Sequence, residues 1–127
     1  MTELLEVKRE LELAVLRGAE DYLEAYGWCQ GSLQSDEGRY CIMGALNASV
    51  RRYEREHYGI ADIYVDAGSF IENDAAKAAD DLVEKIEKKY VRQPLIQWND
   101  THERTEADVM KLLADMIQER ENTDEGS

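Results

Sequence analysis

The sequence contains little proline and cysteine and no long apolar run. These shortages limit the classes of protein to which the chain can belong. It holds one proline, two cysteines and one phenylalanine in 127 residues. No apolar run approaches the roughly 20 residues that a membrane-spanning helix needs. A glycine-rich phosphate loop, a metalloprotease motif and a paired-carboxylate signature are also absent, so no reaction class is spelled out by a motif.

Basic residues are scarce relative to acidic ones. The chain contains 15 lysines and arginines and 28 aspartates and glutamates, which gives a formal net charge of −13. The longest basic clusters are Arg51-Arg52 and Lys88-Lys89. We therefore expect no direct binding to a nucleic-acid backbone or to a membrane. The acidity suits a basic protein partner or mimicry of nucleic acid, and it also serves plain solubility.

The chain length fits one domain. The first six residues include two glutamates where a secretory signal peptide would have basic residues, and their apolar positions are periodic. We therefore expect a cytoplasmic protein. Residues 1–120 are predicted to form one helical domain. Residues 121–127 have nothing to bury and are predicted to be a mobile acidic tail.

Apolar residues recur every three or four positions in four segments, which predicts four α-helices. These segments are residues 2–26, about 40–58, about 73–90 and 105–120. Thr105 and Asp108 resemble a capping box that opens the last helix. The apolar residues of 60–72 show no sustained period, and this insertion is predicted to be mostly loop. The fold class predicted is all-α, a single-domain bundle of about four helices.

Helix 2–26 has a predicted buried stripe and two informative glycines. Gly18 interrupts the pattern, so either the helix bends there or another group packs against the bare backbone. Gly27 follows the last periodic residue, as a left-handed cap requires. In the second helix, Gly44 and Ala48 leave a groove that another backbone can approach. The stripe of the first helix is Leu4, Val7, Leu11, Val15, Ala19, Tyr22 and Tyr26.

The connection between the first two helices is the most unusual stretch. It runs from Gly27 to Tyr40, which is long for a bundle, where 2 to 8 residues are usual, and long ordered loops tend to be functional. Pro94 separates the third helix from a short Trp-Asn-Asp segment. We expect these motifs to form one structural cluster. The candidate binding residues are Trp28, Cys29, Gln30, Cys41, Trp98, Asn99 and Asp100.

Each candidate also has a purely structural interpretation. Trp28 and Trp98 either stack on a ligand ring or seal the end of the bundle, each giving its ring N–H to a backbone carbonyl. Asn99 and Asp100 are typical turn formers and helix caps. The structural interpretation of the two tryptophans is favoured.

Catalytic and metal-binding interpretations rest on the cysteines and histidines. Cys29, Cys41, His57 and His102 match no compact zinc-finger spacing. A Cys29–Cys41 disulfide is disfavoured in the cytosol. Cys41 in a first helical turn would have its pKa lowered by the helix dipole, and His102 oriented by Asp100 would be its best base. We expect no metal and no cofactor, and an enzyme is the less favoured alternative.

Three motifs together resemble a known family. Gly27-Trp28-Cys29-Gln30-Gly31, then Cys41-Ile42-Met43-Gly44-Ala45-Leu46, then Trp98-Asn99-Asp100 before a capped helix, recur in this order in small uncharacterised proteins of actinobacteria and their phages. The resemblance covers roughly residues 10 to 118. It implies a phage or prophage accessory protein, located in the host cytoplasm if phage-encoded, and it brings no established activity.

The function expected from the sequence is binding to a host or phage protein. One alternative is a small-ligand binder or Cys-His enzyme that uses Cys41, His102 and the segment 98–100. The other alternative is a nucleic-acid mimic.

Overall fold

The structure, a computed structural model, describes residues 2–58 and 74–126. Its elements are α1 (Thr2–Tyr26), α2 (Ile42–Tyr58), α3 (Asp74–Lys85), the π-helical turn η2 (Ile86–Tyr90), α4 (Leu95–Asn99) and α5 (Glu106–Gly126). Within these ranges, extended structure is limited to two isolated β-bridges in the loop after α1. The all-α prediction is confirmed. The predicted insertion at 60–72 lies outside the described residues.

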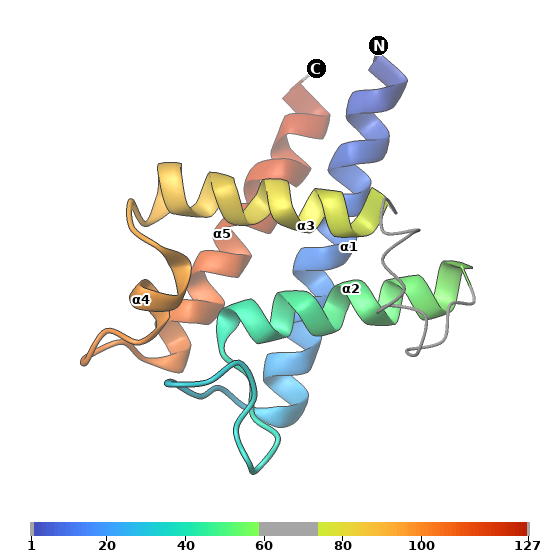
Figure 1. Ribbon diagram of the computed structural model, residues 1–127. Coiled ribbons are helices and arrows are strands. Elements are labelled where there is room, and N and C mark those ends of the chain that lie inside the picture. The colour runs from blue at the N-terminus through green and yellow to red at the C-terminus, as the bar shows by residue number, and fades with distance from the viewer. Residues whose placement is uncertain (1, 59–73, 127) are drawn as a thin grey trace.

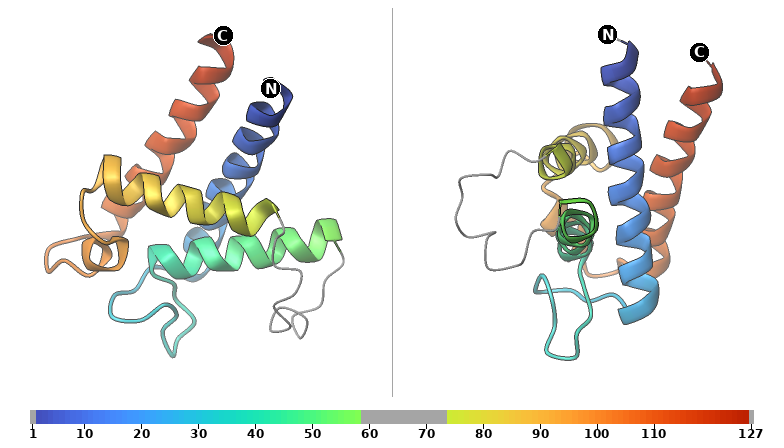
Figure 2. Two further views of the ribbon diagram at one scale, coloured as in Figure 1. Left: turned by 45° about the horizontal axis from the view of Figure 1, so that its top comes forward. Right: turned by 90° about the vertical axis from the view of Figure 1, so that its right-hand side faces the viewer.

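The helices form two pairs that cross. α1 and α5 lie side by side with both termini at one end, and α2 and α3 run together across them (Figure 1). The end-on view in Figure 2 shows α2 and α3 stacked on the same side of α1. The predicted bundle is therefore two layers of helices plus the short α4, which sits beside the start of α2. The core between the layers is built from Val15, Leu16, Leu23, Ile42, Leu46, Leu82, Ile86, Leu95, Val109, Leu113 and Met116.

The buried stripe of α1 differs from the predicted one. Val15 and Ala19 are buried as expected, and Leu16 and Leu23 are buried as well. Tyr26, at the end of the predicted stripe, is 57% exposed. α1 contacts α2, α3 and α5, so more than one face of this helix is covered.

Gly18 lies where the Ser49 side chain of α2 packs against the backbone of α1. A Cβ atom at this position would come within 2.0 Å of Ser49 Oγ. The Ser49 hydroxyl donates a hydrogen bond to the Val15 carbonyl at 2.8 Å. Of the two sequence interpretations of Gly18, the close approach of another group is confirmed.

Two predicted helix ends are confirmed in detail. Gly27 has φ +97° and its N–H donates to the Leu23 carbonyl at 2.9 Å, which is the left-handed cap that only glycine forms without steric cost. At the start of α5, the Thr105 N–H donates to the Asp108 carboxylate at 3.0 Å, and the Asp108 N–H donates to the Thr105 hydroxyl at 3.2 Å. This reciprocal pair is a capping box with Asp in the acidic position.

The third helical segment ends in a π turn that the periodicity did not predict. The Val91 N–H donates to the Ile86 carbonyl, five residues back, at 2.9 Å. Pro94 then precedes α4, and the carboxylate of Glu87 accepts a hydrogen bond from the Leu95 N–H at 2.8 Å. A residue of the π turn thus supplies the hydrogen-bond acceptor for the first backbone N–H of α4.

The last helix extends further than the sequence predicted. α5 runs to Gly126, whereas the periodicity predicted a helix that ends at about residue 120. The mobility expected of residues 121–127 stays a prediction. Glu121 forms an ion pair with Arg17 of α1. The preceding Gln118, Glu119 and Arg120 are good helix formers, so the helix has reasons to continue past its last apolar residue.

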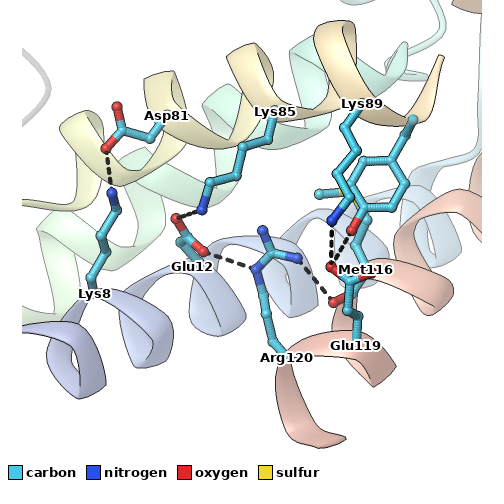
Figure 3. Close-up of polar contacts among 9 residues, drawn as sticks. Lys8, Glu12, Asp81, Lys85, Lys89, Met116, Glu119 and Arg120 are labelled. Atoms are coloured by element: carbon cyan, nitrogen blue, oxygen red, sulfur yellow. Dashed lines mark hydrogen bonds and ion pairs between the residues drawn. The ribbon is translucent and has the colours of Figure 1, made fainter. Parts of the chain in front are cut away.

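A buried ion pair joins α1 to α5 (Figure 3). Glu12 is 3% exposed and Arg120 is 7% exposed. Arg120 Nε donates to Glu12 Oε1 at 2.9 Å, and a second Arg120 nitrogen donates to the Met116 carbonyl at 3.1 Å. Lys85 of α3 reaches the other Glu12 oxygen at 3.4 Å. The periodicity places Glu12 on a polar face, but the structure makes it the polar link among three helices.

We expect Glu12→Leu to lower the free energy of unfolding by about 3–5 kcal/mol, because Arg120 is left as an unpaired buried charge. The double variant Glu12→Leu/Arg120→Met should recover most of this loss, since it removes both charges. Urea unfolding measures each value. Asp115→Ala breaks an exposed pair with Lys111 and should cost less than about 1 kcal/mol. A Glu12→Leu protein as stable as wild type would contradict this assignment.

Candidate functional site

The side chain of Asn99 is the centre of the candidate site. Asn99 is fully buried at the end of α4. Its Oδ1 accepts hydrogen bonds from Trp28 Nε1 at 2.7 Å and from the Ile42 N–H at 3.0 Å. Its Nδ2 donates to the Cys29 carbonyl at 3.1 Å and to Asp100 Oδ1 at 3.0 Å. Both acceptor positions and both hydrogens of the amide are therefore used.

Gln30 and Asp100 extend this arrangement. Gln30 Nε2 donates to the carbonyls of Asn99 and Thr101, both at 2.9 Å. The Gly31 N–H donates to Asp100 Oδ1 at 3.0 Å. We call Trp28, Cys29, Gln30, Ile42, Asn99 and Asp100 the Asn99 cluster. It confirms that the Gly-Trp, Cys and Trp-Asn-Asp motifs meet in space.

The two tryptophans have different surroundings. Trp28 donates its ring N–H to the Asn99 side chain, and not to a backbone carbonyl as predicted. Trp98 is 8% exposed, and the guanidinium of Arg104 lies 4.2 Å from its ring centroid. Arg104 Nε also donates to the Trp98 carbonyl at 2.9 Å. Both indoles are thus engaged by the protein itself.

The loop is fixed to α2 at Gly44. A Cβ atom there would lie 2.0 Å from the Leu33 carbonyl oxygen, a backbone atom. The same oxygen accepts a hydrogen bond from the Cys41 N–H at 3.1 Å. The predicted approach of another backbone to this small-residue face of α2 is confirmed, and the loop itself supplies that backbone.

Both cysteines are free thiols. The Cys29 thiol donates to the carbonyls of Ser32 and Arg39. Cys41 is 3% exposed, and its sulfur accepts from the Gly44 N–H at 3.3 Å. Burial raises the pKa of the Cys41 thiol, and the backbone hydrogen bonds from Gly44 and Met43 oppose this rise without cancelling it. The expectation of a lowered pKa is therefore wrong, because burial outweighs the helix N-terminus.

The Cys-His arrangement considered from the sequence is not assembled. His102 is exposed, and no hydrogen bond within the described ranges joins it to Cys41 or Asp100. Asp100 Oδ1 instead accepts from Asn99 and Gly31. Across the described part of the chain, no three His, Cys, Asp or Glu side chains gather in a way that could hold a metal ion. The side chain of His57 lies outside the described residues.

A small pocket opens beside the Asn99 cluster. Its volume is about 180 Å³, and its lining joins the loop, the start of α2 and α4. Cys41 and Asp100 were candidates from the sequence, whereas Leu33 and Ile96 were missed because no periodicity marks either residue. We call it the Leu33–Ile96 pocket. It is lined by Gly31, Ser32, Leu33, Cys41, Ile96 and Asp100.

The family described as "Family of unknown function (DUF6197)" matches residues 8–119. The chain belongs to this family. The match agrees closely with the extent of the resemblance in the sequence, and it contains every residue of the Asn99 cluster. The occurrence of DUF6197 proteins in actinobacteria and phages stays a prediction. No curated protein and no solved structure matches the chain.

Within the described ranges of this DUF6197 protein, no helix is both long enough and apolar enough to cross a bilayer.

We expect the Cys41 thiol to react slowly with alkylating reagents. Its raised pKa means that the thiolate forms only at a higher pH than in a free cysteine, and burial blocks the reagent. In a Cys29→Ser background, alkylation at pH 7 should be slower than in the denatured chain by about tenfold or more, and it should accelerate as pH rises past the usual thiol range near 8.5. Alkylation at pH 7 as fast as in the denatured chain would instead favour a reactive Cys41.

Proposed function

We propose that this protein is a small accessory protein of phage type that binds a basic region of another protein through its loop end. The loop end comprises residues 27–41 and 95–101. The observation that supports this most directly is the placement of exposed apolar side chains. Three large hydrophobic residues are exposed in the described part of the chain, namely Tyr26 (57%), Leu33 (47%) and Ile96 (48%). All three lie in the loop end or directly beside it.

The Leu33–Ile96 pocket suits an apolar side chain of the partner. Leu33 and Ile96 form apolar walls, and the buried Cys41 thiol is only weakly polar. Interface hot spots are apolar or aromatic anchors that fill such pockets, surrounded by a polar rim. The Asn99 cluster holds the loop in place before binding, which lowers the entropy that association would otherwise cost.

Acidic side chains give the loop end its preference for a basic partner. Asp36 and Glu37 are exposed at the tip of the loop, and Asp100 and Glu103 are exposed at and after the end of α4. Asp100 itself lines the pocket. The net charge of −13 extends the same field over the molecule. An apolar residue flanked by lysines or arginines therefore matches this surface in shape and charge.

The alternatives have less support. A Cys-His enzyme requires a reactive Cys41, whereas burial raises the pKa of that thiol. A nucleic-acid mimic would use the same acidity, but it would not need an apolar pocket. The resemblance to proteins of actinobacteria and their phages supports a phage or prophage origin, and the chain's membership in a family of unknown function is compatible with it.

We expect Leu33→Ser and Ile96→Ser each to weaken binding by about tenfold, the effect of losing a modest hot-spot contact. Binding is measured by surface plasmon resonance with a partner captured from the lysate of the encoding or host bacterium. Gln118→Ala truncates an exposed side chain of similar size on α5 and should leave affinity unchanged. Association should also slow between low and physiological salt, as the Debye length shortens to about 8 Å.

Equal binding by wild type and the Leu33→Ser/Ile96→Ser double variant would show that the loop end is not the interface. An association rate that does not change with salt would remove the electrostatic part of the proposal. The nucleic-acid mimic would be favoured if duplex DNA competes with this protein for the partner and neither Leu33→Ser nor Ile96→Ser weakens binding.

A further inference from the structure

A second pocket lies between the loop and α2. Its volume is about 240 Å³. Tyr22 of α1 forms one side, Leu33, Gln34 and Tyr40 of the loop form another, and α2 forms the base. We call it the Arg51 pocket, after the α2 residue whose charge matters most below.

The pocket exists because α2 lacks side-chain bulk along this face. Gly44 has no room for a Cβ atom under the Leu33 carbonyl, and Ala48 follows one turn later. The loop therefore lies directly on the helix at Gly44, and the face beyond it is left hollow. The hollow is a consequence of the same close approach that fixes the loop.

One wall of the pocket is aromatic. The rings of Tyr22 and Tyr40 meet edge to face, with centroids 5.5 Å apart and an interplanar angle of 74°. Tyr26 packs against both rings, with centroids 5.9 Å from each. Because the three rings pack against one another, they are already ordered before a ligand binds. They offer a planar ligand a stacking or edge contact.

The charge of the pocket is opposite to that of the molecule. In a chain of net charge −13, its lining contains two arginines, Arg51 and Arg55, and no carboxylate. The neighbouring Arg52 is paired with Asp21 at 3.1 Å and lies over the Tyr22 ring. Arg51 has no ion-pair partner within residues 2–58 and 74–126. Its guanidinium lies near Tyr40, where it opposes the rise in the Tyr40 pKa that burial causes.

We propose that the Arg51 pocket binds a small molecule that joins a planar aromatic ring to one anionic group, a phosphate or a carboxylate. The ring contacts Tyr22 and Tyr40. The anion pairs with the Arg51 guanidinium, whose fork of donors matches both kinds of oxyanion. Because the net charge of −13 repels anions from the molecule, we expect a charged group without the ring to gain little there.

Four probes separate the parts of this proposal. Phenyl phosphate and benzoate carry the ring with either anion, benzyl alcohol carries the ring alone, and inorganic phosphate carries the charge alone. Binding is followed by NMR titration of the backbone amides of the full chain. We expect saturable shifts at Tyr40, Asn47 and Arg51 with phenyl phosphate, benzoate or both, and much weaker responses to the other two probes. The stronger of the two ring anions identifies the group that the pocket prefers.

The matched variants are Arg51→Gln and Lys111→Gln, which change the net charge equally. Arg51→Gln should weaken binding by about tenfold or more, the usual effect of losing a charge-assisted hydrogen bond, and Lys111→Gln should not. Ala48→Leu fills the pocket and should abolish binding while keeping the charge. Thermal unfolding checks that each variant is folded.

The proposal is overturned if inorganic phosphate binds as well as phenyl phosphate, if Arg51→Gln binds like wild type, or if no probe gives saturable shifts. Failure of this proposal is distinguishable from failure of the proposed protein interface, because Ile96 lines only the Leu33–Ile96 pocket, and Arg51 and Ala48 line only the Arg51 pocket.

Discussion

The amide of Asn99 is the interaction on which the loop end depends. Its four hydrogen-bond partners come from the loop, from the first residue of α2 and from the end of α4, and the loop and α2 partners lie 57 to 71 residues away in the sequence. An amide buried without partners is costly, so an arrangement that satisfies all four positions is favoured over any in which the loop moves away. The positions of Leu33, Cys41 and Asp100 follow from it. Leu33 lines both pockets, so both depend on the same fixed loop.

A second polar contact fixes the helices behind the loop. The Glu12–Arg120 pair ties α1 to α5, and Lys85 brings α3 to the same carboxylate. Buried ion pairs add little net stability compared with apolar packing, but they penalise every arrangement that separates the two charges. Ser49 and Glu54 are the other buried polar residues of the described ranges, and the rest of the described core is apolar. The two polar contacts thus select one packing of the helices and one conformation of the loop.

The parts of the fold that the sequence predicted are those set by local chemistry. Gly27 as a cap and the close approach at Gly18 each follow from one glycine, and the capping box follows from Thr105 and Asp108, three positions apart. Asn99 was interpreted as a turn former because the residues that bury it are distant in sequence. Glu12 was placed on a polar face for the same reason, since its partner is 108 residues away. Leu33 and Ile96 have no periodic pattern, so their shared pocket emerged only from the fold.

Amide hydrogen exchange in Asn99→Ala is the most direct test of this account. If the Asn99 amide holds the loop, amides of residues 28–40 and of Ile42 should exchange much faster in the variant, while those in the middle of α1 and α5 keep most of their protection. Two results would contradict the account. One is a loop that stays as protected as in wild type. The other is an equal loss of protection in the loop and in both helices, which would make Asn99 a general contributor to stability and not the residue that positions the loop.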